Sequence, residues 1–199
     1  MPKSKKQSID PEDLLTAEFE YIAQTAEQAN EDRTSVISFF LIAVGSPLAA
    51  LFSTEALKLE IESKSVSFLF SGLFFILTFL GTSTILQLAR LRGAWYESML
   101  AMNHMKEFLI KNSDFDISGA FLWRATTAPK RFKINSVNFY QAAEVAILSG
   151  LLFAACIFFL LQGLNGTTES SQNIILGLSI VLGLLNIWFQ INLYRRFVN

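Results

Sequence analysis

Residues 66–89 read VSFLFSGLFFILTFLGTSTILQLA, without one charged side chain. A helix needs about 20 apolar residues to cross a hydrocarbon core of about 30 Å, so this run predicts a transmembrane helix. The chain as a whole is 52% hydrophobic and contains 19 Phe, which is more than an ordinary soluble domain carries. Further charge-free runs occupy residues 34–54, 145–168 and 170–194. The predicted spans are residues 34–54, 66–89, 137–162 and 173–194.

The cations gather on one side of these spans. Among the 16 lysines and arginines, only Lys58 and Lys64 lie between the first and second spans, and none lies between the third and fourth. The positive-inside rule therefore predicts cytoplasmic N- and C-termini and a cytoplasmic middle segment, in a multi-pass protein of the inner (plasma) membrane. Residues 3–6 are basic, but no apolar run with a cleavage site follows them, so we expect no secretory signal.

Two spans are expected to extend into the cytoplasm as helices. Asp10 and Pro11 form a helix start, and residues 1–33 are predicted to be a cytoplasmic N-terminal helix. Its apolar seam continues into the first span at spacings of three and four, and a similar stripe follows the second span over residues 90–111. We predict an all-α integral membrane protein with four transmembrane helices in two hairpins, helices one and two being extended into a cytoplasmic helical layer. The residues of the predicted gating seam are Leu15, Phe19, Ile22 and Arg33.

Residues 90–136 are predicted to be a cytoplasmic helix followed by an interfacial basic-aromatic segment. Aromatic rings that alternate with cations suit the lipid headgroup layer, where one side is apolar and the other is wet. The same composition also suits nucleic acid or a phosphorylated ligand. The predicted ligand or lipid contacts are Trp123, Arg124, Lys130, Arg131 and Lys133.

Small residues recur in steps of four along the third span, at Ala142, Ala146, Gly150 and Ala154. This pattern allows two helix backbones to approach closely in lipid. It is explained either by packing within one chain or by contacts between subunits. Pro47 is expected to kink the first span, because its ring blocks a backbone hydrogen bond.

Polar side chains inside the spans are the main functional signal. Asn and Gln in hydrocarbon require a partner or water, so they serve either as bonds between helices or as the lining of a wet path. The pore-lining candidates are Ser71, Thr78, Thr82, Asn186 and Gln190. Glu144 is the one acidic residue of a span, and a cation such as Arg90 or Arg195 is expected to neutralise it. Alternatively, a ring of Glu144 side chains forms an inner-mouth charge that favours cations.

The sequence lacks the motifs of common enzyme chemistry. It has no P-loop, no glycine-rich dinucleotide turn, no His-Glu-x-x-His and no nucleophile elbow. Its one histidine, His104, has no acid-base partner at helical spacing except Glu107 and Lys106, so we expect a solvated side chain. Its one cysteine, Cys156, excludes a thiolate metal site. We therefore expect no enzymatic activity, no cofactor and no metal.

Residues 17–33 read AEFEYIAQTAEQANEDR and lead directly into a span. Together with the plan of cytoplasmic helices and two hairpins, this stretch resembles the small multi-spanning membrane effectors, of pore or channel type, in prokaryotic antiviral defence systems. The resemblance implies that the protein damages or depolarises the membrane when a nucleotide signal is made.

The expected function is a homo-oligomeric ion channel or membrane-permeabilising effector that is gated through its cytoplasmic helices. A tetramer is the expected oligomer, by analogy with channel symmetry. The expected partners are membrane lipid, further copies of the chain, and a cytoplasmic protein or nucleotide-type signal. The alternative is a non-conducting membrane scaffold or regulatory subunit that recruits a cytoplasmic partner.

Overall fold

The computed structural model describes residues 10–53, 64–116, 118–165 and 169–199, and within these ranges it contains helices and no strand. The helices are α1 (Pro11–Ser53), α2 (Lys64–Lys111), the short 3-10 helix η2 (Ser118–Ala120), α3 (Val137–Asn165) and α4 (Glu169–Val198). The all-α fold class is confirmed. The predicted basic cluster at residues 3–6, Lys58, and residue 54 of the first span lie outside the described residues.

Local capping explains where the helices begin and end. The Oδ1 atom of Asp10 accepts a hydrogen bond from the amide of Glu12 at 3.0 Å, so the predicted cap of α1 is confirmed. Ser136 caps α3 in the same way, through the amide of Phe139 at 3.3 Å. The Nδ2 group of Asn112 donates to the carbonyl of Phe108 at 2.8 Å, at the point where α2 ends.

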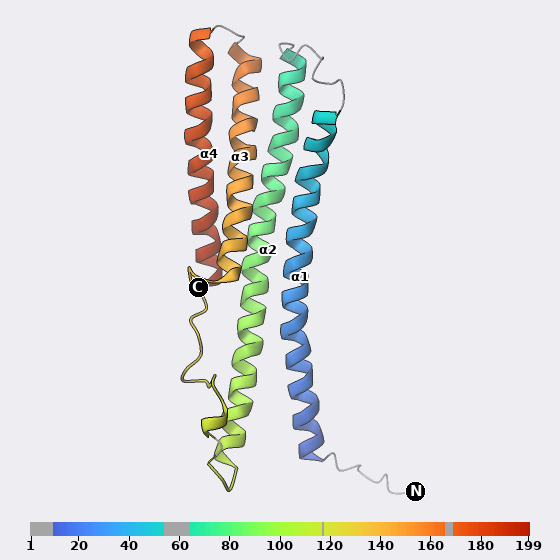
Figure 1. Ribbon diagram of the computed structural model, residues 1–199, viewed down its shortest axis with the longest axis vertical. Helices are drawn as coiled ribbons and strands as arrows, with labels where there is room; N and C mark the ends of the chain where they lie inside the picture. Colours follow the sequence, from blue (N-terminus) through green and yellow to red (C-terminus); the bar gives the residue numbers. More distant parts are fainter. Residues whose placement is uncertain (1–9, 54–63, 117, 166–168) are drawn as a thin grey trace, which may run out of the picture.

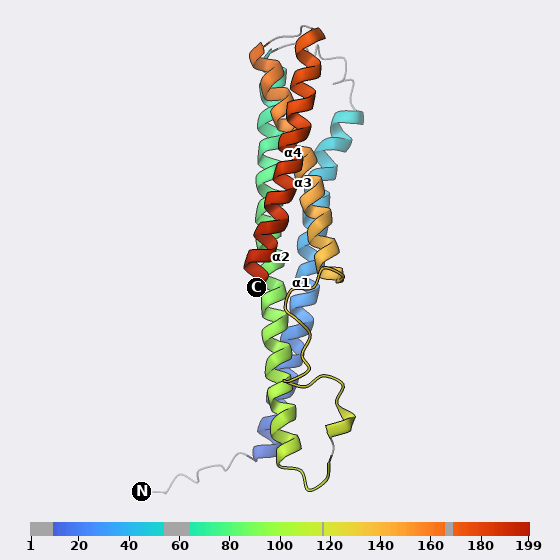
Figure 2. The ribbon, with the colours of Figure 1, turned by 90° about the vertical axis from the view of Figure 1, so that its left-hand side faces the viewer.

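Helix α2 is the axis of the molecule. It packs against α1 on one side and against α3 and α4 on the other, whereas α1 and α3 make few contacts. Figure 1 shows α3 and α4 beside the upper part of α2 only. We call residues 11–33 of α1 with residues 90–111 of α2 the stalk, and the rest of α1 and α2 with α3 and α4 the four-helix half. Among the described residues, the segment 112–136 runs beside the stalk (Figure 2).

Three helices in the described part of the chain are long and apolar enough to cross a membrane: α2, α3 as Val137–Leu164, and α4 as Gln172–Val198. The chain therefore has the character of a membrane protein. Helix α1 does not meet the same criterion within the described residues, so the fourth span, residues 34–54, stays a prediction. Pro47 lies inside α1, and Figure 2 shows the upper end of this helix diverging from the other three.

The core of the four-helix half is apolar and continuous. Its buried residues include Phe40 of α1, Ile85 and Leu88 of α2, and Val145 of α3. Phe74 of α2 stacks on Phe159 of α3, with ring centroids 5.7 Å apart. Large apolar side chains also cover the outer surface, such as Phe79 at 67% and Trp188 at 67% exposed. A surface of this kind suits lipid.

Candidate functional site

Polar side chains from α2, α3 and α4 meet in the interior of the four-helix half. Gln190 of α4 and Ser149 of α3 are each 0% exposed, and Thr78 of α2 is 6% exposed. Thr82 and Asn186 are half-buried beside them. We call these five residues the polar cluster.

Gln190 is the centre of the polar cluster. Its Nε2 group lies 2.7 Å from Ser149 Oγ, 3.0 Å from Asn186 Oδ1 and 3.2 Å from Thr82 Oγ1. Ser149 Oγ in turn donates to the carbonyl oxygen of Thr78 at 3.3 Å. An amide group has only two hydrogens to donate, so the three acceptors share them. The cluster therefore ties α2, α3 and α4 to one another.

The absence of side chains at two glycines allows this close packing. A Cβ atom at Gly81 would lie 2.6 Å from Ser149 Oγ and 3.3 Å from Phe40 Cε2. A Cβ atom at Gly150 would lie 2.9 Å from the carbonyl oxygen of Gly183, on α4. Backbones approach this closely only where small residues face each other, so Gly81 and Gly150 set the spacing of the three helices around the polar cluster.

One acceptor in the polar cluster has no partner among the described residues. Gln190 Oε1 is buried and accepts no hydrogen bond from them. A buried carbonyl without a donor costs free energy, which a change of packing or the entry of water would relieve. The cluster contains no ionisable side chain, so its chemistry is hydrogen bonding to water or to an ion, and not proton transfer.

Four of the five pore-lining candidates belong to the polar cluster. The fifth, Ser71, lies two helical turns away and donates to the carbonyl oxygen of Cys156 at 3.1 Å. These side chains face the interior of a single chain and not an outer face where copies could meet. Their predicted role as the lining of a pore between copies would require the bundle to rearrange.

The small-residue stripe of α3 is also turned inward. Ala142 and Ala146 are buried in the core with α2, and Gly150 faces Gly183 and Ile187 of α4. A Cβ atom at Gly183 would lie 2.9 Å from the Cβ atom of Ala154. The stripe therefore serves contacts within one chain in this arrangement.

Glu144 lies on the outer face of α3, together with the exposed side chains of Tyr140 and Ile147. Neither Arg90 nor Arg195 forms an ion pair with it, and no other described residue does so. The expected neutralising cation is therefore not found in the described part of one chain. Its predicted place at the inner mouth of a pore stays a prediction.

Arginines join the stalk to the four-helix half. Arg33 of α1 donates a hydrogen bond from Nη1 to Asn138 Oδ1 of α3. Arg92 of α2 donates from Nε to the carbonyl oxygen of Arg131 at 3.1 Å, and its guanidinium carbon lies 4.4 Å from the centre of the Trp95 ring. Burial lowers the pKa of both guanidinium groups below the ordinary value. These contacts fix α1 and the middle segment at the base of the bundle.

The predicted gating seam runs along the contact of α1 with α2. Ile22 is buried, Leu15 and Arg33 are half-buried, and Phe19 is 40% exposed. Leu15 and Phe19 line a groove of the stalk whose other walls include Leu109 and Phe121. The seam therefore links the end of the stalk to the four-helix half through one unbroken helix.

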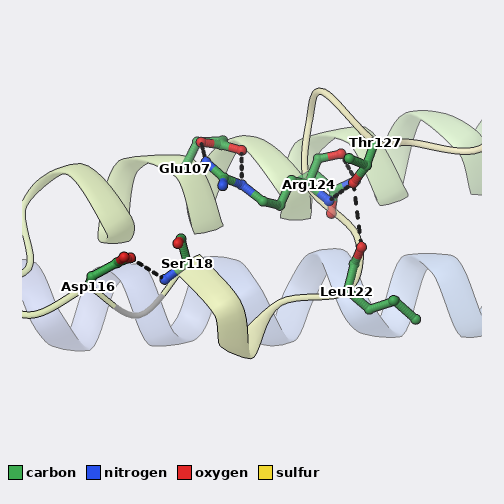
Figure 3. A network of polar contacts seen from close by, with 7 residues as sticks. Glu107, Asp116, Ser118, Leu122, Arg124 and Thr127 are labelled. Atoms are coloured by element: carbon green, nitrogen blue, oxygen red, sulfur yellow. Dashed lines mark hydrogen bonds and ion pairs between the residues drawn. The ribbon is translucent and has the colours of Figure 1, made fainter.

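The basic-aromatic segment follows the stalk. Arg124 forms a two-pronged ion pair with Glu107 of α2, with both N–O distances 2.9 Å (Figure 3). Glu107 lies 17 residues beyond Arg90 in the same helix, which is about 25 Å at 1.5 Å per residue. Trp123 and Arg124 thus lie far below the expected headgroup layer. The residues Lys130, Arg131 and Lys133 lie closer to the start of α3.

The bond from Arg124 holds the pKa of the Glu107 carboxyl below its ordinary value. In the same segment, the hydrogen bond from Ser118 lowers the pKa of Asp116 (Figure 3). Asn103 of α2 adds a weaker contact to the carbonyl oxygen of Arg124 at 3.5 Å. The segment is therefore held to the stalk by charged and polar contacts.

One exposed stripe on α1 was not among the predicted pore-lining residues. Ser35, Ser38, Gly45 and Ala49 lie on one outer face, which also carries Ile42 and is flanked by the exposed Phe39 and Leu41. The signal was present in the sequence, because these residues recur at spacings of three and four on the face opposite to Val36 and Phe40. Small and polar residues on an outer face suit a contact with another copy or with water more than a contact with lipid.

The fold and the site together define a helical membrane protein with a long stalk and a polar interior. Comparisons with protein-family models, curated proteins and solved structures found no match. No group of His, Cys, Asp and Glu that could hold a metal ion occurs in the ranges that the structure describes.

Proposed function

We propose that the chain spans the inner membrane four times, through residues 34–54, 66–89, 137–162 and 173–194, with both termini in the cytoplasm. The apolar lengths of α2, α3 and α4 support three of these spans. The first is supported by the position of α1 beside α2 and by its exposed Phe39 and Leu41. Single cysteines at Ser65 and Gln172 should react with an impermeant thiol reagent from outside the cell, and one at Asp114 should not. Labelling of Asp114 from outside would contradict this topology.

We further propose that the protein is a homo-oligomeric ion channel or membrane-permeabilising effector whose stalk controls the membrane helices. The observation that carries this proposal is continuity: α1 and α2 each run without a break from the stalk into the four-helix half. Helix α2 also supplies Thr78 and Thr82 to the polar cluster. A partner that tilts or separates the stalk helices would therefore move these residues as well. That partner must bind the two arrangements with different affinity.

The outer stripe of α1 is the best lining for a path between copies. Ser35 and Ser38 offer hydroxyl groups, and Gly45 leaves room for a close approach. The polar cluster inside each chain would then exchange its hydrogen bonds when the stalk moves. The size of the ring is proposed as four by analogy with channel symmetry, and mass measurement in nanodiscs tests it.

The direct test is current recording from purified protein in a planar bilayer. Ser38→Leu should reduce the current through a single pore while leaving assembly intact. Asn192→Leu is the matched control, because Asn192 is also exposed on the four-helix half but lies on α4 and donates its hydrogen bond within that helix. If both variants reduce the current through a single pore equally, the α1 stripe does not line the pore.

A second candidate is a non-conducting scaffold or regulatory subunit that recruits a cytoplasmic partner. The observation that favours it is the closure of the polar cluster by hydrogen bonds within one chain, which is also what simple packing requires. Antiviral effector function stands as a proposal drawn from the resemblance of residues 17–33, with a cytoplasmic protein or nucleotide-type molecule as the signal. Absence of current from correctly assembled protein would favour the scaffold.

A further inference from the structure

A basic groove lies where the middle segment meets the end of α4. It is open to one side, and no acidic side chain lines it. Its apolar walls are Phe132 and Ile134. The guanidinium carbon of Arg195 lies 5.7 Å from the centre of the Phe132 ring, so this cation is held over the apolar wall. The lining residues are Lys130, Arg131, Phe132, Lys133, Ile134, Asn135, Arg195 and Asn199.

Three of the four cations in this groove have no acidic side chain as a partner among the described residues. Arg131 forms an ion pair with Glu97 at 3.4 Å, and its guanidinium carbon lies 5.8 Å from the centre of the Tyr96 ring, so its charge is directed to α2. Lys130, Lys133 and Arg195 form no ion pair with any described residue. Three cations gathered at one groove repel one another unless an anion lies between them.

The groove lies at the depth of lipid headgroups if the proposed topology is correct. Arg195 directly follows the fourth span, and Asn135 precedes the third by two residues. Trp123 and Arg124 are excluded from this layer by the ion pair with Glu107, which holds them along the stalk. The structure therefore divides the basic-aromatic segment, and in the proposed topology only its later part, with α4, lies near the membrane surface.

We infer that this groove binds the phosphate group of an anionic phospholipid, held between Lys130, Lys133 and Arg195. The inference rests on the proposed topology and is independent of whether the protein conducts. The amide side chain of Asn135 offers a further donor to the phosphate oxygens, and the exposed Ile134 faces the apolar part of the lipid. An arrangement of this kind matches basic pockets at the cytoplasmic side of membrane helices.

The test uses the full-length protein in bilayers of equal parts phosphatidylcholine and phosphatidylglycerol, followed by native mass spectrometry of the lipid that stays bound. The wild-type protein should retain phosphatidylglycerol in preference to phosphatidylcholine. Arg195→Gln and Lys133→Gln should each weaken this preference by about fivefold, the effect expected for one cation near an anionic surface.

Two matched controls separate a site from general attraction. Arg196→Gln changes the neighbouring cation of α4, which is exposed but does not line the groove. Lys111→Gln removes a cation at the end of the stalk. Both controls should keep the wild-type preference. Equal losses in Arg195→Gln and Arg196→Gln would overturn the inference, because they would show diffuse surface attraction.

Competition with a soluble phosphate shows whether the groove binds a lipid headgroup or a free phosphate. Inorganic phosphate or ATP, added to the same bilayers, should not displace phosphatidylglycerol, because neither fills the apolar wall. Displacement at equal concentration would assign the groove to a soluble anion and would overturn the lipid proposal. Labelling of Asp114 from outside would instead mean that the topology itself is wrong, so the two failures are distinguishable.

Discussion

The stalk and the four-helix half share α1 and α2 but are held together by different interactions. In the stalk, apolar residues such as Ile22 and Ala26 are buried between two helices, while ion pairs fix the middle segment outside them. In the four-helix half, small residues bring the backbones close and the polar cluster bonds them. The difference follows from the expected surroundings: apolar contact is strong in water, whereas in lipid close packing and hydrogen bonds drive helix association.

The largest effect is expected where backbones approach most closely. Gly150→Leu places a side chain against Ile187 and the carbonyl oxygen of Gly183, so α3 and α4 must separate. We expect a loss of about 3 kcal/mol or more in the free energy of unfolding, measured by unfolding in mixed detergent. Gly177→Leu is the control, because a Cβ atom at Gly177 meets nothing within 4 Å. If the two variants were equally stable, close packing would not be the main interaction that holds the four-helix half together.

A smaller effect is expected from the polar cluster. Gln190→Leu removes the bonds to Ser149, Asn186 and Thr82, which in a membrane are together worth about 1–2 kcal/mol. The control is Asn192→Leu, because Asn192 is exposed and its side chain bonds only to the carbonyl oxygen of Trp188 in its own helix. The same unfolding measurement compares the two. A Gln190→Leu protein as stable as the control would mean that the cluster does not hold the helices together.

The smallest effect is expected in the stalk, from the half-buried pair of Glu107 and Arg124. The pKa of Glu107 is lowered in the folded protein, so the pair stabilises the segment above the ordinary carboxyl range and is lost as pH falls through the lowered value. The protection factors of residues 121–127 in hydrogen exchange, which correct for the slower intrinsic exchange in acid, should fall over that acidic range. Glu107→Gln should remove this pH dependence, whereas Glu97→Gln, which breaks the longer pair with Arg131, should keep it. If the pH dependence of hydrogen exchange is unchanged in Glu107→Gln, other contacts must bind the segment to the stalk.

The sequence was sufficient for the elements of the fold. The charge-free runs and the Asp10 cap determine where helices occur, because apolar length and capping are local properties. The long seam from Leu15 onward likewise predicted one continuous helix, and α1 is continuous from Pro11 to Ser53. These features depend on residues that are close in the chain.

The direction in which polar residues face could not be read from spacing alone. Gln190 was predicted either to bond helices or to line a wet path, and its inward position is set by Ser149, 41 residues away. The path of the basic-aromatic segment depends on the ion pair of Arg124 with Glu107, 17 residues away. Such choices are made by tertiary contacts, which no local pattern specifies.

The central claim, that the stalk controls a conducting path, is tested most directly by recording current from wild-type protein and from a variant with two glycines inserted after Arg33. Glycines break the stiffness of α1 between the stalk and the four-helix half. We predict that the wild-type protein conducts and that the insertion changes the fraction of time the pore is open, without changing the current through one open pore. Absence of current from correctly assembled wild-type protein, or an identical open fraction in both proteins, would contradict the account.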